Sequence, residues 1–116
     1  MAEKNLNLCV LYDFYGNMLT DKQREVFEMY YSEDLSLAEI AEQEGISRQG
    51  VHDNISRTET ILLEMEKATG CVARAKLLRA AMNEINDAAE QLLRSSDLTV
   101  QRNAQRILTA AASLKE

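Results

Sequence analysis

Proline is absent from this sequence, and glycine occurs only four times in 116 residues. Both residues mark the ends of strands and irregular loops, so their scarcity argues against a β-rich or loop-rich fold. Ala, Leu, Glu, Arg and Lys are abundant instead, and these residues favour helix. We therefore predict an all-α chain.

Long hydrophobic runs are also missing. No stretch approaches the length needed to cross a bilayer, and the apolar start LNLCVLY is interrupted by Asp13 and followed by no cleavage-type segment. The two cysteines, Cys9 and Cys71, have no CxxC partner, which signals neither a zinc site nor a disulfide framework. We expect a cytoplasmic protein with no membrane insertion, whose two thiols are reduced and buried.

The residues of enzyme and cofactor sites are scarce as well. The single histidine, His52, has no serine or cysteine nucleophile placed beside it by a local motif, and no glycine-rich phosphate loop is present. Its neighbour Asp53 points in a different direction on a helix, so the two do not make a metal site. We expect no enzyme activity, no cofactor and no metal, with His52 exposed on a helix.

Helical periodicity runs along the whole chain instead. Two capping boxes, Thr20 with Gln23 and Ser36 with Glu39, predict the starts of a second and a third helix. Gly45 is predicted to end the third helix, and Ser47 to cap a fourth that continues to Gly70. Apolar stripes predict the buried faces, in chain order: Leu8, Leu11, Tyr12, Tyr15 and Leu19; Val26, Phe27, Tyr30 and Tyr31; Leu37, Ile40 and Ala41; Val51, Ile55, Thr58, Leu62 and Met65.

The segment after Gly70 is predicted to form a helical hairpin. Helical patterns over residues 72–93 and 98–114 are separated by the polar sequence RSSD. Apolar residues recur every three or four positions on both helices, at Leu78, Met82, Ile85, Ala89 and Leu92, then at Val100, Ala104, Ile107, Ala111 and Leu114. Such stripes suit either packing within one chain or a dimer interface. We predict two domains, residues 1–70 and a hairpin at 71–116, and expect the hairpin to make a homodimer.

The tight corner GISRQGVHDN, residues 45–54, is the candidate binding element. The residues after a helical corner line the first turns of the second helix, where nucleic-acid readers place their contact residues. Charge opposes a strong phosphate contact, because residues 1–34 and residues 35–70 each carry seven acidic and three basic residues. Asp53 and Glu59 add negative charge along the fourth helix, and Glu44 occupies a position that is commonly apolar in such corners.

Residues 19–63, LTDKQREVFEMYYSEDLSLAEIAEQEGISRQGVHDNISRTETIL, resemble region 4 of bacterial sigma factors, particularly the extracytoplasmic type. Taken over the full chain, LYDFYGNMLTDKQREVFEMYYSEDLSLAEIAE and ISRQGVHDNISRTE resemble the YlxM-type family of small helix-turn-helix proteins. This resemblance implies a helix-turn-helix domain and a bacterial regulatory protein of the signal recognition particle pathway.

Carried onto this sequence, the resemblance places the turn and recognition-helix positions at Ser47, Arg48, Gln49, His52, Asp53 and Ser56, with Ala41, Gly45, Ile46, Val51 and Ile55 holding the helix crossing. Two functions remain open. In the first, Arg48 and Gln49 contact base edges, while Ser47, Arg24 and Arg57 contact phosphates. The predicted nucleic-acid-binding residues are Arg24, Ser47, Arg48, Gln49, His52, Ser56 and Arg57. In the second, the scaffold binds the particle's GTPase or its RNA complex without contacting DNA.

Overall fold

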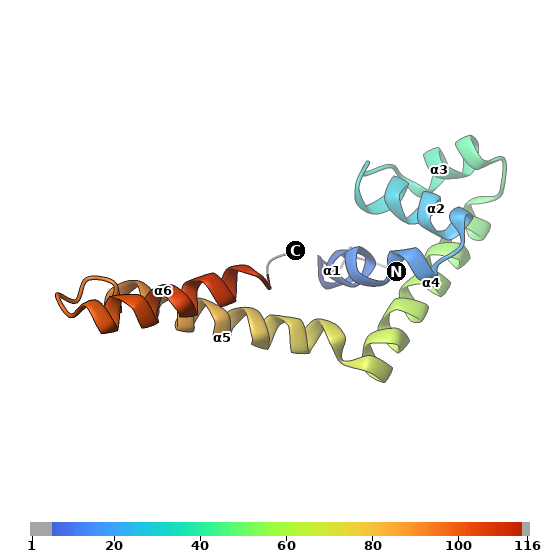
Figure 1. Cartoon of the computed structure of the whole chain (residues 1–116). Helices are drawn as coiled ribbons and strands as arrows, with labels where there is room; N and C mark the ends of the chain where they lie inside the picture. The colour runs from blue at the N-terminus through green and yellow to red at the C-terminus, as the bar shows by residue number, and fades with distance from the viewer. Residues whose placement is uncertain (1–5, 115–116) are drawn as a thin grey trace. The chain divides into compact units, whose positions relative to one another are not determined.

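A computed structural model describes residues 6–114 of the chain, which contain helices and no strand (Figure 1). The elements are α1 (Leu6–Tyr15), the 3-10 helix η1 (Gly16–Met18), α2 (Asp21–Tyr31), α3 (Leu37–Glu44), α4 (Arg48–Thr69), α5 (Cys71–Leu92) and α6 (Leu98–Ala112). The all-α prediction is confirmed. The chain divides into two compact units, residues 1–72 and residues 73–116.

Both predicted capping boxes are present. The Thr20 hydroxyl accepts a hydrogen bond from the Gln23 amide, and the Gln23 side chain accepts one from the Thr20 amide. Ser36 and Glu39 repeat this arrangement at α3, and the backbone hydrogen bond from Ser36 lowers the pKa of Glu39. Each box satisfies two amides that a helix start would otherwise leave unpaired.

Two glycines end helices in the left-handed conformation. Gly45 follows α3 with φ of 68°, and Gly70 follows α4 with φ of 63°. A side chain is disfavoured at such angles, which is why glycine serves at this position. At the start of α6, Asp97 accepts hydrogen bonds from the amides of Thr99 and Val100.

Residues 1–72 contain two buried apolar clusters. The first joins α1, α2 and the second half of α4, and Phe27 stacks on Tyr12 with ring centroids 4.4 Å apart. The second joins α2, α3 and the first half of α4. Its members are Val26, Met29, Ile40, Ala41, Val51 and Ile55. The long helix α4 therefore supports both clusters along one buried face.

A polar contact fixes the end of α4. The Tyr15 hydroxyl donates to Glu66 Oε1 over 2.6 Å and lies 2.5 Å from Thr69 Oγ1. The same Glu66 oxygen accepts from the amide of Val72 over 3.0 Å, so it also caps the first turn of α5. Burial, followed by the hydrogen bond to Glu66, raises the pKa of Tyr15. These bonds hold α1, the Gly70 turn and the start of α5 together.

Several expectations about burial were wrong in detail. Tyr30 and Tyr31 are half-buried, whereas Met29, which we had not included, is buried. Three other members of the predicted buried stripes, Tyr12, Leu37 and Met65, are only partly buried. Ile46 is 45% exposed, because its side chain lies over Gly50 at the turn and not between the helices. Cys9 is half-buried and Cys71 is exposed, since Cys71 opens α5 directly after the Gly70 turn.

The second unit is a helical hairpin in which α6 returns along α5 (Figure 1). Between residues 73 and 114, the apolar residues that become buried are three alanines, Ala89, Ala104 and Ala111. Most of the larger members of the predicted stripes are exposed, among them Leu78, Ile85 and Leu92 of α5, whereas Met82 and Val100 are half-buried. Within residues 6–114, no helix has the length and apolar character needed to span a membrane.

Candidate nucleic-acid interface on α4

The corner between α3 and α4 is built from local and core contacts. The Ile46 amide donates to the Ala41 carbonyl over 3.2 Å across the left-handed Gly45, and the Ser47 hydroxyl accepts from the Gly50 amide over 2.9 Å. Ile40 and Val51 are fully buried on the two sides of the corner, and Ala41 is 7% exposed. The burial of one face of α4 leaves its opposite face open to solvent.

Arg48, Gln49 and His52 occupy the first turns of α4. The side chains of Arg48 and Gln49 are exposed, as a reading role requires. Gln49 Nε2 donates to Asp53 Oδ1 over 2.9 Å, and His52 Nδ1 lies 3.6 Å from the same oxygen. The structure thus gathers two candidate reading side chains around one carboxylate, Asp53.

His52 differs from the expected exposed histidine. Its side chain is 36% exposed, and its Nδ1 atom is buried without a hydrogen-bond partner in the described structure. The helix carries it at the border between the buried face and the open face. One edge of the imidazole is therefore the part available to a ligand.

The remaining predicted residues of α4 lie along the same helix. Ser47 is exposed, and its oxygen already serves as the helix cap. Ser56 is half-buried, and Arg57 is exposed. Helical spacing places Gln49, Asp53 and Arg57 in a row, four residues apart, on the side away from the core. We call Arg48, Gln49, His52, Asp53, Ser56 and Arg57 the outer face of α4.

Arg24 lies in a different environment. Its side chain lies close enough to the Tyr12 hydroxyl of α1 to lower the pKa of that hydroxyl. Burial and a hydrogen bond to Glu28 raise the pKa of that hydroxyl, and Arg24 opposes the shift. The structure therefore places Arg24 beside Tyr12 of α1, and it gives no contact between Arg24 and the described outer face of α4.

Two carboxylates that seemed to oppose binding are engaged elsewhere. Glu44 has a side chain only 7% exposed, and it accepts a hydrogen bond from Lys22 Nζ over 2.7 Å. Glu59 accepts a hydrogen bond from the Tyr31 hydroxyl of α2. The outer face of α4 consequently carries one carboxylate, Asp53, rather than two.

The Lys22–Glu44 pair went unrecognised in the sequence. It joins the first turn of α2 to the last turn of α3, and the hydrogen bond to Glu44 raises the pKa of Lys22.

Thr60 is a further exposed polar residue of α4 that the sequence analysis did not include among the candidate binding residues. It is exposed one turn beyond Ser56 and bonds the Ser56 carbonyl over 3.0 Å. Its spacing of four from Ser56 was the available signal.

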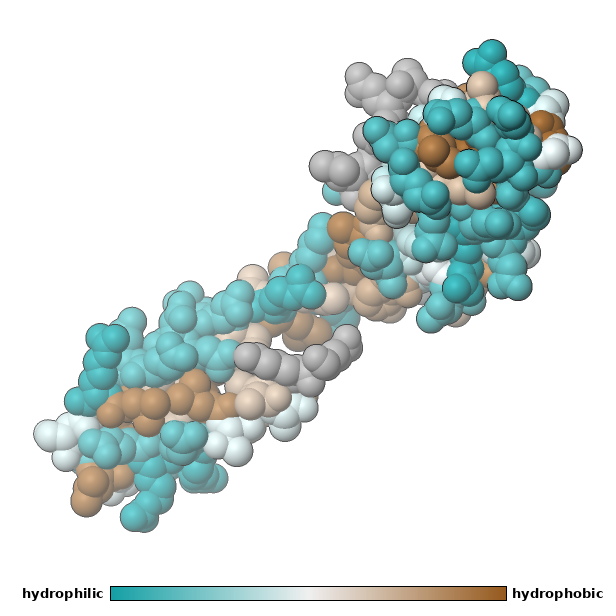
Figure 2. Space-filling model, turned by 90° about the horizontal axis from the view of Figure 1, so that it is seen from above, coloured by the Kyte–Doolittle hydropathy of each residue, from teal (hydrophilic) through white to brown (hydrophobic). Residues whose placement is uncertain are grey.

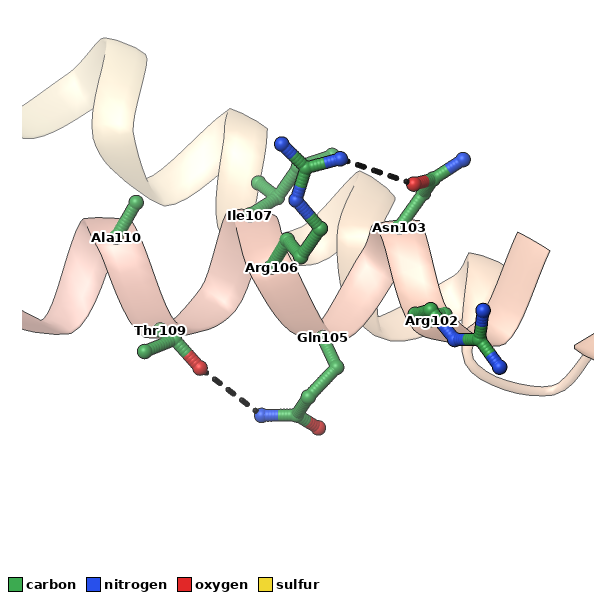
Figure 3. A pocket seen from close by; sticks show the side chains of 7 residues that line it. All are labelled: Arg102, Asn103, Gln105, Arg106, Ile107, Thr109 and Ala110. Carbon is green, nitrogen blue, oxygen red and sulfur yellow. Dashed lines mark hydrogen bonds between the residues drawn. The ribbon is translucent and has the colours of Figure 1, made fainter. Parts of the chain in front are cut away.

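Other candidate sites are weaker. A depression of about 930 Å³ is lined by residues of α6 alone, including Arg102, Arg106 and Ile107 (Figure 3). Arg106 Nη1 bonds Asn103 over 3.4 Å and Gln105 bonds Thr109 over 3.3 Å, so these polar groups interact along the helix. Among residues 6–114, no three His, Cys, Asp or Glu side chains gather as metal ligands do.

The chain has the arrangement of a helix-turn-helix protein. Helix α3 is followed by the left-handed turn at Gly45 and then by α4, whose outer face is open. The model of the family described as "Putative helix-turn-helix protein, YlxM / p13 like" matches residues 2–101, and the chain belongs to this family. This result confirms the YlxM-type identification made from the sequence.

Curated bacterial relatives share much of the chain. A UPF0122 protein of Thermoanaerobacter sp. strain X514 is 47% identical over 90 residues, which cover 78% of this chain and 77% of the relative. One from Symbiobacterium thermophilum is 41% identical over 105 residues, covering 90% and 94%. A third, from Halalkalibacterium halodurans, is 39% identical over 98 residues, covering 84% and 90%.

Proposed function

We propose that this helix-turn-helix protein is a cytosolic regulator of the signal recognition particle pathway that binds nucleic acid through the outer face of α4. Arg48 and Gln49 contact base edges, and Ser47 and Arg57 contact phosphates. The observation that carries the proposal is the exposure of Arg48 and Gln49 on the first turns of α4, directly after the glycine turn. The link to the targeting pathway comes from the family resemblance.

Electrostatics supports this choice of surface within an acidic domain. Lys22 is paired with Glu44, and Arg24 lies beside Tyr12, whose pKa it lowers. Arg48 and Arg57 are exposed on α4 and make no ion pair within the described structure. The positive end of the α4 helix dipole adds to the potential near Arg48. Within the described part of residues 1–72, the exposed cations without an ion pair therefore lie on α4.

A protein-binding function is the alternative. Residues 1–70 carry fourteen acidic and six basic residues, a balance that weakens binding to phosphates and favours a basic partner. In this alternative the same outer face contacts the particle's GTPase or its RNA complex, without DNA. The two functions predict different sensitivity to nuclease.

A pull-down from bacterial cytosol tests the proposal. The full chain and Arg48→Ala serve as bait, each with and without nuclease treatment, and Lys67→Ala controls for the loss of an exposed cation at the far end of α4. We expect the full chain and Lys67→Ala to capture specific RNA or DNA, identified by sequencing, and Arg48→Ala to capture much less. Capture of the same proteins in all arms, unaffected by nuclease, would establish the protein-binding function instead.

A further inference from the structure

The hairpin of residues 73–114 fully buries only small apolar side chains. Its buried apolar residues are Ala89, Ala104 and Ala111, whereas the two buried apolar clusters found among the described residues lie within residues 1–72. Most of the stability of a helix in a protein comes from the packing of its apolar face against another element. Larger apolar side chains of the described hairpin, Met82, Leu93, Val100 and Leu108, are only half-buried.

Large aliphatic side chains lie open beside this alanine seam. On α5, Leu78, Ile85 and Leu92 are 60%, 46% and 47% exposed. On α6, Ile107 and Leu114 are 39% and 68% exposed, and Val100 is half-buried. Figure 2 shows an apolar strip along the hairpin bordered by hydrophilic side chains. We call these six residues the apolar face of the hairpin.

The spacing of the apolar face is that of helix bundles. Leu78, Ile85 and Leu92 are seven residues apart, and so are Val100, Ile107 and Leu114. Seven residues make nearly two helical turns, so each set forms a stripe along one side of its helix. On each helix the stripe is rotated in the same sense from the buried alanines Ala89, Ala104 and Ala111. Because the two helices are antiparallel, this rotation places both stripes on the same side of the hairpin.

We propose that the apolar face packs against the same face of a second copy of this chain, so that two hairpins close an antiparallel four-helix bundle. Two-helix hairpins with heptad-spaced apolar residues on both helices are the halves of such bundles. A two-fold axis lets one surface serve as its own partner, with each copy covering the other's exposed leucines and isoleucines.

The size and charge of the hairpin are compatible with a second copy of the chain as the partner. A 22-residue helix such as α5 is about 33 Å long and two adjacent helices are about 20 Å wide, which gives a face on the order of 650 Å². One side of a specific interface measures about 800 Å², a similar size. Residues 71–116 carry seven basic and five acidic residues, so two hairpins meet with little repulsion.

Sedimentation equilibrium of the full chain tests the dimer, with one pair of variants on α5. Ile85→Glu places a charge in the middle of the apolar face. Asn83→Glu introduces the same charge two residues away, about 200° around the helix, at an exposed position. We expect the wild type and Asn83→Glu to have twice the chain mass of 13.1 kDa at micromolar concentrations, and Ile85→Glu to have the chain mass.

A second pair on α6 and a folding control complete the experiment. Ile107→Glu should dissociate the dimer and Gln105→Glu, two residues away and exposed, should leave it intact. Circular dichroism of the dissociated variants at matched concentration shows whether α1 to α4 remain folded, and the wild-type melting temperature should rise with concentration. A monomeric wild type, or equal masses for Ile85→Glu and Asn83→Glu, would overturn the proposal.

Discussion

Asp53 is the charged residue that most affects how the outer face of α4 can bind. Its carboxylate accepts the hydrogen bond from Gln49 and lies 3.6 Å from His52, and its side chain is 59% exposed. A ligand that reads Gln49 must share or replace this hydrogen bond. A phosphate-bearing ligand must also tolerate a negative charge between Arg48 and Arg57.

Replacing Asp53 with asparagine should therefore strengthen nucleic-acid binding. Asparagine keeps an oxygen that can accept from Gln49 but removes the repulsion of phosphates, so we expect the dissociation constant for a duplex or a structured RNA to fall several-fold at low salt. Glu64→Gln, an exposed position later on α4, is the control. Fluorescence anisotropy measures both, and weaker binding by Asp53→Asn would argue that the face receives a basic protein.

For single residues, the sequence predicts those interactions whose partners are close together along the chain. The Thr20 and Ser36 capping boxes were predictable because their partners are three residues away and backbone geometry brings them together. The Lys22–Glu44 bond spans 22 positions and depends on how α2 packs against α3. For that reason Glu44 seemed from the sequence to be a misplaced charge.

The α3–α4 corner places two glycines in different roles. Gly45 has φ of 68°, whereas Gly50 lies in the first turn of α4, where its amide donates to the Ser47 cap. A Cβ at Gly50 would lie 3.2 Å from Ser47 Oγ and 3.7 Å from Ile46 Cδ1, and one at Gly45 would meet no atom within 4 Å. The effect of a side chain on stability is thus set by backbone strain at Gly45 and by helix propensity at Gly50.

Alanine substitutions at the two glycines should change stability in opposite directions. Gly45→Ala should destabilise the protein by about 1 to 2 kcal/mol, the cost of a left-handed residue with a side chain. Gly50→Ala should stabilise it by up to about 1 kcal/mol, because alanine favours helix and Ser47 needs only a small shift. Urea denaturation measures both changes. A loss at Gly50 equal to that at Gly45 would mean that the Ser47 contact outweighs helix propensity.

The helices themselves were predictable, but the covering of their apolar stripes was not. The same spacing of three and four residues marks Val51, Ile55 and Leu62, which are fully buried, and Leu78 and Ile85, which are exposed. Periodicity identifies the side of a helix that is apolar, and it contains no information about which element, or which copy of the chain, packs there. The exposure of the apolar stripes in the hairpin could therefore be learned only from the structure.

For the whole molecule, the acidic balance of residues 1–70 limits how strongly nucleic acid can bind. Each phosphate that a cation neutralises on duplex DNA contributes about −0.9 to the slope of log K against log salt. The phosphate contact of Arg57 alone therefore gives a slope of about −1, and the slope reaches about −2 only if Arg48 also neutralises a phosphate. A dimer would double this value, and its two helix-turn-helix units could contact half-sites about 34 Å apart. The self-association of the hairpin and the binding by α4 would then act together.

The most direct test of nucleic-acid binding by α4 is the salt dependence of binding by wild type, Arg48→Ala and Lys67→Ala. Equilibrium titrations of a labelled mixed-sequence duplex and a structured RNA, between about 50 and 200 mM salt, give the affinity and slope for each protein. We predict salt-dependent binding by wild type and Lys67→Ala, and binding by Arg48→Ala that is weaker by about 1 to 3 kcal/mol. Equal affinities for wild type and Arg48→Ala, or no binding to either nucleic acid at the lowest salt, would contradict it.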